Sequence, residues 1–154
     1  MTSSPRSLFL GVVPSKTGAF ALLDSAGNIV QVADMPVVHG QVDPDDLFRA
    51  LARHADSIRL AYVENNFIRD GEAAPLIFAR GKYLGVVLGI LVALQIPHQA
   101  QRPAAPHGGN GQAPGMHNYS KRKALALALR AKGDHFAAIA ALPRPEGQTM
   151  EDSQ

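Results

Sequence analysis

Cysteine and tryptophan are both absent from this chain of 154 residues. Without cysteine the chain can form neither a disulfide nor a thiolate zinc site, and this composition fits a reducing compartment. Long hydrophobic runs are also lacking, because the longest, from Tyr83 to Ile96, is shorter than the roughly 20 residues of a membrane-spanning helix. Pro14 and Lys16 interrupt the apolar stretch near the N-terminus, which argues against a signal peptide. We therefore expect a cytoplasmic protein with no membrane partner.

Acidic residues are missing from a long internal stretch. The formal net charge is only +2, yet it divides into −3 over residues 1–72, +8 over residues 73–133 and −3 over residues 134–154. A basic block without a single acid favours a polyanionic partner such as DNA, although such cations can also merely solvate loops. The block contains eight candidate phosphate ligands: Arg80, Lys82, Arg102, Lys121, Arg122, Lys123, Arg130 and Lys132.

Apolar runs and capping residues predict an order of strands and helices. Buried or alternating apolar segments predict strands over residues 7–13, 19–24, 29–35 and 59–63. Caps and apolar periodicity predict helices that begin at Asp43, at about residue 73, at Ser120 and at Asp134. Gly133 is expected to end the third of these helices, and Pro97 to cut short a fifth strand that opens at Ile96.

The remaining segments define the expected domain. Residues 97–118, rich in Pro, Gly, Gln and His, predict a flexible loop, and residues 143–154 a polar, disordered tail. Residues 1–142 are then one domain. Three antiparallel strands followed by parallel strands and interleaved helices predict an α/β fold of the ribonuclease H-like class, a mixed sheet flanked by helices.

Several segments resemble one family in the same order. These segments are Leu8 to Met35, Tyr62-Val63-Glu64, Phe78 to Gly85 with Gly89, and Lys121 to Leu142. Together they resemble RuvC-like Holliday junction resolvases, especially the short phage-type members. The resemblance implies homodimers that bind branched DNA and four carboxylates that hold two Mg²⁺ ions for phosphodiester cleavage. It also implies a place near the nucleoid or in a phage-infected cell.

Only half of the expected acids are present. The resemblance places the first-strand Asp at Val13, the fourth-strand Glu at Glu64, and the two last-helix Asp residues at Asp134 and Ala137. Valine and alanine offer no lone pair to a metal, so Glu64 and Asp134 remain as weak metal ligands. We therefore expect a protein that binds branched or duplex DNA with lost or impaired nuclease activity.

Two alternatives remain open. One is an active Mg²⁺-dependent Holliday junction endonuclease in which Asp70 or Glu72 completes a non-standard site. The other is a catalytically dead fold that serves as a protein-interaction module. Four of the six histidines, His98, His107, His117 and His135, are irregularly spaced and predict solvated side chains rather than a metal site.

Two apolar features bear on DNA and dimer contacts. Phe67 follows Glu64 closely and resembles the position from which family members insert an apolar wedge at the junction crossover, the alternative being a core residue. Gly81, Gly85 and Gly89 recur every four residues, so they share one face of the predicted helix. That face is either a dimer seam or a close contact with the domain's own sheet.

Overall fold

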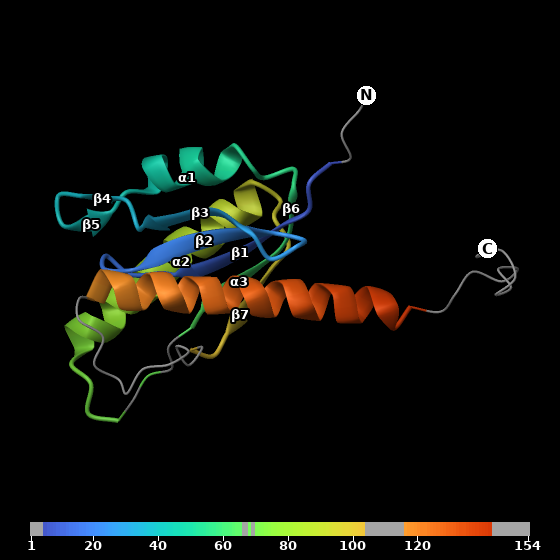
Figure 1. Cartoon of the computed structure of the whole chain (residues 1–154). Coiled ribbons are helices and arrows are strands. Elements are labelled where there is room, and N and C mark those ends of the chain that lie inside the picture. The colour runs from blue at the N-terminus through green and yellow to red at the C-terminus, as the bar shows by residue number, and fades with distance from the viewer. Residues whose placement is uncertain (1–4, 66–67, 69, 104–115, 143–154) are drawn as a thin grey trace, which may run out of the picture.

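Five strands form one mixed sheet at the centre of the molecule (Figure 1). The computed structural model describes residues 5–65, 68, 70–103 and 116–142. The strand order is β3-β2-β1-β6-β7, in which β2 runs antiparallel to its two neighbours while β6 and β7 run parallel to β1. The strands are β1 (Leu8–Val13), β2 (Ala19–Asp24), β3 (Ile29–Asp34), β6 (Ile58–Glu64) and β7 (His98–Gln101). The predicted mixed α/β fold is confirmed.

The central strands are apolar because helices cover both faces of the sheet. All six residues of β1 and the first five of β2 are buried, as expected for strands packed on two sides. The β2–β3 turn is closed by Asp24, whose Oδ1 accepts hydrogen bonds from the backbone N–H groups of Ala26 and Asn28 at 2.9 Å. Gly27 supplies the positive φ of 86° that this turn requires.

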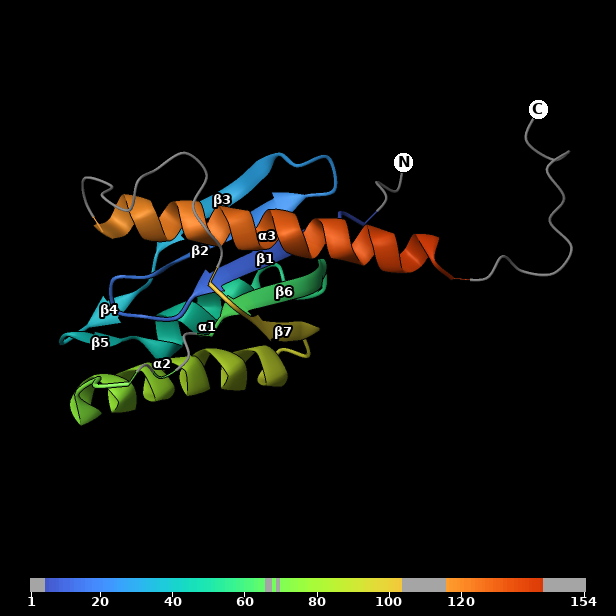
Figure 2. The same ribbon diagram turned by 90° about the horizontal axis from the view of Figure 1, so that it is seen from below.

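Helices α1 (Pro44–Ala52) and α2 (Ala74–Ala93) cover one face of the sheet, and α3 (Met116–Ala140) covers the other (Figure 2). As predicted, Asp43 caps α1, and its Oδ1 accepts hydrogen bonds from the N–H groups of Asp45 and Asp46. On the α3 face the core consists of Phe9, Val13, Ala19, Ala21, Tyr62, Ala124, Leu127 and Ala131. This face carries the site described below.

Helix α3 differs from its prediction. It runs unbroken through Gly133, so Ser120 lies inside the helix and Asp134 begins no new one. A glycine ends a helix when it takes a left-handed conformation, whereas an interior glycine costs only about 1 kcal/mol. Gly133 is not among the glycines with positive φ, and the apolar contacts of α3 with the sheet outweigh that cost.

One short pairing was not predicted, and the fifth strand forms after Pro97, which was expected to cut it short. The expected loop of residues 97–118 contains β7, which pairs with β6 directly after Pro97, while Met116 already begins α3. Strands β4 (Val37–Val38) and β5 (Gln41–Val42) form a hairpin, whose turn holds His39 and Gly40 at positive φ. The tail of residues 143–154 and residues 104–115 of the expected loop lie outside the described residues.

Helix α2 is longer than the apolar run noted in the sequence. With 20 residues and a mean hydropathy of 1.8 it has the length and composition of a membrane span. Here it packs on the sheet through Tyr83, Val87, Ile90 and Leu91, which are all buried. Length and composition do not separate such a core helix from a membrane span, so they carry no conclusion about a membrane.

Candidate functional site at the carboxyl ends of β1 and β6

A buried ion pair joins the sheet to α3. Glu64 ends β6 and is 1% exposed, and its Oε1 lies 2.7 Å from the Nζ of Lys123. The Lys123 side chain is itself only 12% exposed, and its ammonium lies 5.2 Å from the centre of the Tyr119 ring. A carboxylate this deep in the protein requires a compensating charge, which α3 supplies.

Small residues allow α3 to approach the sheet this closely. A Cβ on Gly11 would lie 2.0 Å from the carbonyl oxygen of Ala124 and 2.7 Å from the backbone nitrogen of Ala128. Only glycine therefore fits at this position of β1. The close contact sets the register of α3 on the sheet and so brings Lys123 to Glu64.

Ser120 lies on the same sheet-facing stripe of α3, four residues before Ala124, and it is 7% exposed. Phe9 contacts Phe136 while Gly11 faces Ala124, so α3 runs antiparallel to β1. Ser120 also precedes Lys123 by three residues, so the two side chains are neighbours on the same side of the helix.

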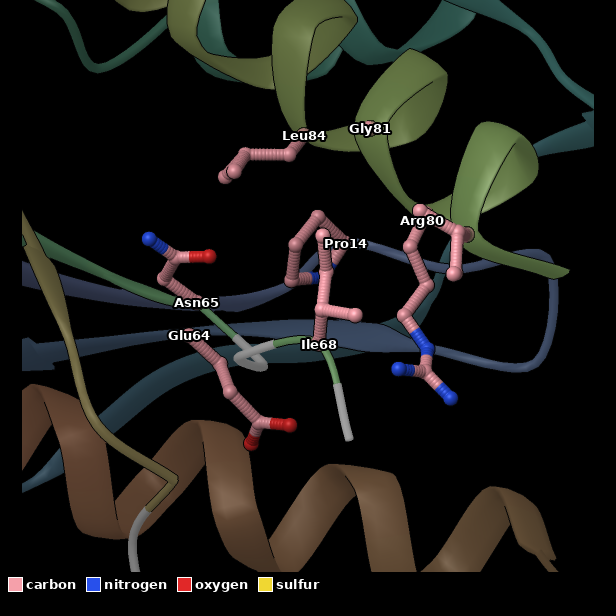
Figure 3. Close-up of a pocket in the computed structure, with 8 residues that line it drawn as sticks. Pro14, Glu64, Asn65, Ile68, Arg80, Gly81 and Leu84 are labelled. Carbon is pink, nitrogen blue, oxygen red and sulfur yellow. The ribbon is translucent and has the colours of Figure 1, made fainter. Parts of the chain in front are cut away.

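A cavity adjoins Glu64 on the α2 side of these strand ends (Figure 3). Its volume is about 210 Å³. Pro14, Glu64, Asn65 and Ile68 line it from the strand ends, and Ile77, Arg80, Gly81 and Leu84 line it from α2. The crevice beyond the carboxyl ends of parallel strands is where α/β folds bind ligands.

Two solved structures share this architecture. Thermus thermophilus RuvC in complex with Holliday junction substrate is 14% identical to this chain, with a TM-score of 0.54. A second Thermus thermophilus RuvC structure is 17% identical, with a TM-score of 0.50, and each alignment covers 86% of this chain and 96% of the other. The chain has a RuvC-like fold. At these identities the likeness establishes the fold alone. No family model and no curated protein matches the chain.

The structure places two of the expected acid positions, Asp134 and Ala137, elsewhere than the family resemblance implies. Asp134 accepts a hydrogen bond from the hydroxyl of Tyr62 at 2.5 Å, and its neighbour His135 packs on Phe9 at the amino end of β1. Ala137, one turn further along, is exposed. Because α3 continues through Gly133, Asp134 lies beside Tyr62 and not beside Glu64, and Ala137 lies three residues further along the helix. The α3 residue at the corner of the sheet beside Glu64 is Lys123, three residues after Ser120.

This corner does not fit a pair of Mg²⁺ ions. Mg²⁺ prefers oxygen ligands such as carboxylates, whereas an ammonium donates hydrogen bonds and is itself a cation. Glu64 pairs here with Lys123, and the residues that end β1 and precede Lys123 by one turn are Val13 and Ser120, which are both buried. Among the described residues no group of three or more His, Asp or Glu could hold a metal ion.

The acids considered as substitutes lie elsewhere. Glu72 accepts a hydrogen bond from Arg80 at 2.8 Å, which raises the pKa of that arginine, and Asp70 is exposed in the loop before α2. Among the histidines, His98 contacts the carbonyl oxygen of Ile96. His107 lies outside the described residues, as does the side chain of His117.

The predicted phosphate ligands fall into different environments. Lys123 pairs with Glu64, and its side chain is 12% exposed. Arg80 pairs with Glu72, and Lys121 lies 3.6 Å from Asp34. The remaining five candidates are exposed or half-buried: Lys82, Arg102, Arg122, Arg130 and Lys132.

Two of the exposed cations lie on α2 and α3, and the ammonium of one of them, Lys82, donates a hydrogen bond to Oε1 of Gln41 at 3.0 Å. Lys82 comes from the first half of α2 and Arg122 from the first half of α3, and these helix halves lie at the same end of the molecule in both views (Figures 1 and 2). Phe67, the predicted wedge, lies outside the described residues.

Gly81, Gly85 and Gly89 are exposed on α2, and Gly81 also lines the cavity. A Cβ on any of them would meet no atom within 4 Å, so none packs against the described part of the chain's own sheet. The intramolecular explanation for these glycines is therefore wrong. What remains is an exposed small-residue face along a helix of the RuvC-like fold.

Sequence reasoning did not assign Ser120 to this site or foresee the pairing of Lys123 with Glu64. One signal was present, because Ser120, Ala124, Leu127, Ala128 and Ala131 recur at helical spacing and mark the sheet-facing stripe. That stripe could have placed Lys123 beside the sheet. It could not have named Glu64 as the partner, since 59 residues separate the two in the sequence.

Proposed function

We propose that this protein binds branched DNA as a homodimer in the cytoplasm and does not cleave it through a two-metal site. The RuvC-like fold supports DNA binding, since one neighbour was solved in complex with Holliday junction substrate. The basic block of residues 73–133 supports the same partner, because it supplies exposed cations on α2 and α3.

One observation carries the proposed loss of cleavage, the ion pair between Lys123 and Glu64. The ammonium already neutralises the acid that the RuvC resemblance assigns to metal binding. At roughly 4 Å, a divalent cation and this ammonium would repel each other by about 8 kcal/mol at an effective dielectric constant of about 20. Mg²⁺ could bind Glu64 only after Lys123 had moved away from its buried partner.

The homodimer is proposed from the exposed glycines of α2. Gly81, Gly85 and Gly89 would let a second copy of the helix approach closely, and a two-fold dimer matches the symmetry of a four-way junction. Gly85→Leu should therefore convert a dimer into a monomer in sedimentation velocity. Gly133→Leu is the matched control, because that exposed glycine lies on α3 and should leave the dimer intact.

DNA binding is tested by measuring affinity for a four-way junction and for duplex of equal length across a salt series. We expect tighter binding to the junction and a linear fall of log affinity with log salt concentration. Arg122→Ala should reduce the salt slope by about 1. Arg53→Ala, an exposed arginine at the end of α1 on the opposite face, should leave the slope unchanged. Salt-independent indifference to junction and duplex contradicts the proposal, and a protein partner captured without nucleic acid would then favour the interaction module.

Cleavage is tested by incubating labelled junction with Mg²⁺ or Mn²⁺. The wild type should leave the strands intact. Symmetric nicks that disappear in Glu64→Gln would instead establish an active nuclease. The triple variant Val13→Asp, Ser120→Asp, Lys123→Asp should gain Mn²⁺ binding in calorimetry, because it places acids at the end of β1, at the α3 residue that contacts Glu64 and one turn before it. The matched variant Val13→Asp, Ala137→Asp should bind no Mn²⁺, because Ala137 is exposed far along α3.

A further inference from the structure

The cavity beside Glu64 has walls suited to a flat, uncharged ring. We infer that it receives one unpaired nucleobase of the branched DNA, an inference that rests on the proposed function. A volume of about 210 Å³ equals the share of roughly seven water molecules at about 30 Å³ each. That is space for a single aromatic ring system and less than the roughly 300 Å³ at which pockets for drug-sized ligands begin.

Apolar groups face this space from two sides (Figure 3). Pro14 and Ile68 contribute from the loops after β1 and β6, while Ile77 and Leu84 contribute from α2. Gly81 adds no side chain, and a Cβ there would meet nothing within 4 Å, so α2 leaves this side open. Extruded bases are commonly held between apolar walls of this kind.

Asn65 supplies a polar group at the edge of the cavity. Its backbone N–H donates to the carbonyl oxygen of Gln101 at 2.7 Å, which anchors the residue after β6. Its side-chain amide makes no hydrogen bond to a described residue and points into the space lined by Pro14 and Leu84 in Figure 3. An amide offers both a donor and an acceptor, which matches the edge of a nucleobase.

The charges around the cavity favour a base over a phosphate. Among the described residues that line the cavity, the two charged ones are committed within the protein, Arg80 to Glu72 at 2.8 Å and Glu64 to Lys123 at 2.7 Å. Within this described lining, a phosphate would therefore enter next to a carboxylate without an uncommitted cation. The exposed Lys82 and Arg122 lie outside the cavity, where a DNA backbone can contact them while a base enters.

Branched DNA supplies such a base more easily than duplex does. Extrusion costs unpairing and unstacking, and a base pair at a strand crossover lacks the continuous stacking on both sides that a duplex provides. The cavity would thus contribute to junction affinity while leaving duplex binding to the surface cations. This division of contacts distinguishes it from a general phosphate site.

Fluorescence of 2-aminopurine tests the inference on the full chain. The reporter is placed at each crossover position of a four-way junction and in duplex of the same sequence. Saturating wild-type protein should raise emission several-fold at one crossover position or more and leave the duplex signal unchanged. Asn65→Ala should reduce this rise by at least half, whereas Gln99→Ala, an exposed β7 residue outside the cavity, should not.

Affinity for unlabelled DNA gives a second measurement. Ile77→Trp fills the cavity and should weaken junction binding about tenfold, with duplex binding unchanged, because a buried base contact of this kind contributes about one to two powers of ten. Leu76→Trp is the matched control. Leu76 is the residue next to Ile77, but its side chain is 58% exposed and does not line the cavity. Should Ile77→Trp fail to fold in a thermal melt, the Asn65→Ala comparison decides alone.

The outcomes separate the two levels of the proposal. Tight junction binding without an emission change at any crossover position overturns the cavity inference and leaves the proposed function standing. Equal loss of affinity in Ile77→Trp and Leu76→Trp also overturns it, because the effect then comes from the surface. Absence of wild-type junction binding overturns the proposed function itself.

Discussion

Removing the ammonium of Lys123 should destabilise the protein far more than removing a surface charge. Lys123→Met keeps the length and the apolar stem of the side chain but takes the cation away from a carboxylate that is 1% exposed. Breaking a buried ion pair at one partner costs about 3–5 kcal/mol. Because the lysine keeps 12% exposure, we expect a loss near the lower end, about 3 kcal/mol.

Lys121→Met is the matched control within the same helical turn. Its ammonium lies 3.6 Å from Asp34, and the two side chains are 34% and 50% exposed. Exposed pairs of this kind contribute about 0–1 kcal/mol. The two variants remove the same charge from neighbouring positions of α3, so the difference between them reports burial of the ion pair.

Urea unfolding of a double-mutant cycle measures the pair directly. The cycle comprises wild type, Lys123→Met, Glu64→Gln and the double variant, with free energies of unfolding from linear extrapolation. The double variant should recover about 2 kcal/mol relative to the sum of the single losses, because both charges have left the interior. A loss below about 1 kcal/mol for Lys123→Met, or additive single losses, would refute the reasoning.

Further predictions concern packing, capping and titration. Gly11→Ala should cost more than about 3 kcal/mol in urea unfolding, because its Cβ would overlap the backbone of Ala124, whereas Gly133→Ala should stabilise by up to about 1 kcal/mol in its open position. Asp43→Ala should lose about 1 kcal/mol with the cap of α1. Burial, followed by the contact with Asp134, raises the pKa of Tyr62 to about 12 from an ordinary value of 10.0; stability from this group is therefore present below pH 10 and falls as the pH rises toward 12. Absorbance at 295 nm should show one tyrosine titrating near pH 12, and Tyr62→Phe should abolish that step.

The parts of the fold that could be predicted are segments whose local sequence is compatible with only one kind of secondary structure. The continuous apolar run of β1 is buried along its whole length, and the Asp43-Pro44 pair starts α1 as predicted. Gly133 was misleading because a single glycine is a weak signal inside a helix whose apolar stripe continues on both sides. Strand β7 was not recognised after Pro97 because its residues, His98–Gln101, show no run of large apolar side chains. These residues form a strand because they pair with the edge of β6.

The candidate site was predictable in part. Glu64 was identified from its place at the end of a strand, where the RuvC resemblance expects an acid, and it is indeed buried there. The resemblance assigned Asp134 to the site as the first acid of the last helix. In the continuous helix α3, the residue that reaches Glu64 is Lys123, about three turns before Asp134.

By itself, the sequence determined the apolar strands and the basic block without acids, and its resemblance to the RuvC-like family placed Val13 where that family has an acid. These features depend on residue type and local spacing, which can be read directly from the sequence. Only the tertiary structure decided that the cation nearest Glu64 is a lysine of the chain itself, because that contact depends on how closely α3 packs over Gly11. A distance of 2.7 Å between residues 59 positions apart is a property of packing, and no local pattern encodes it.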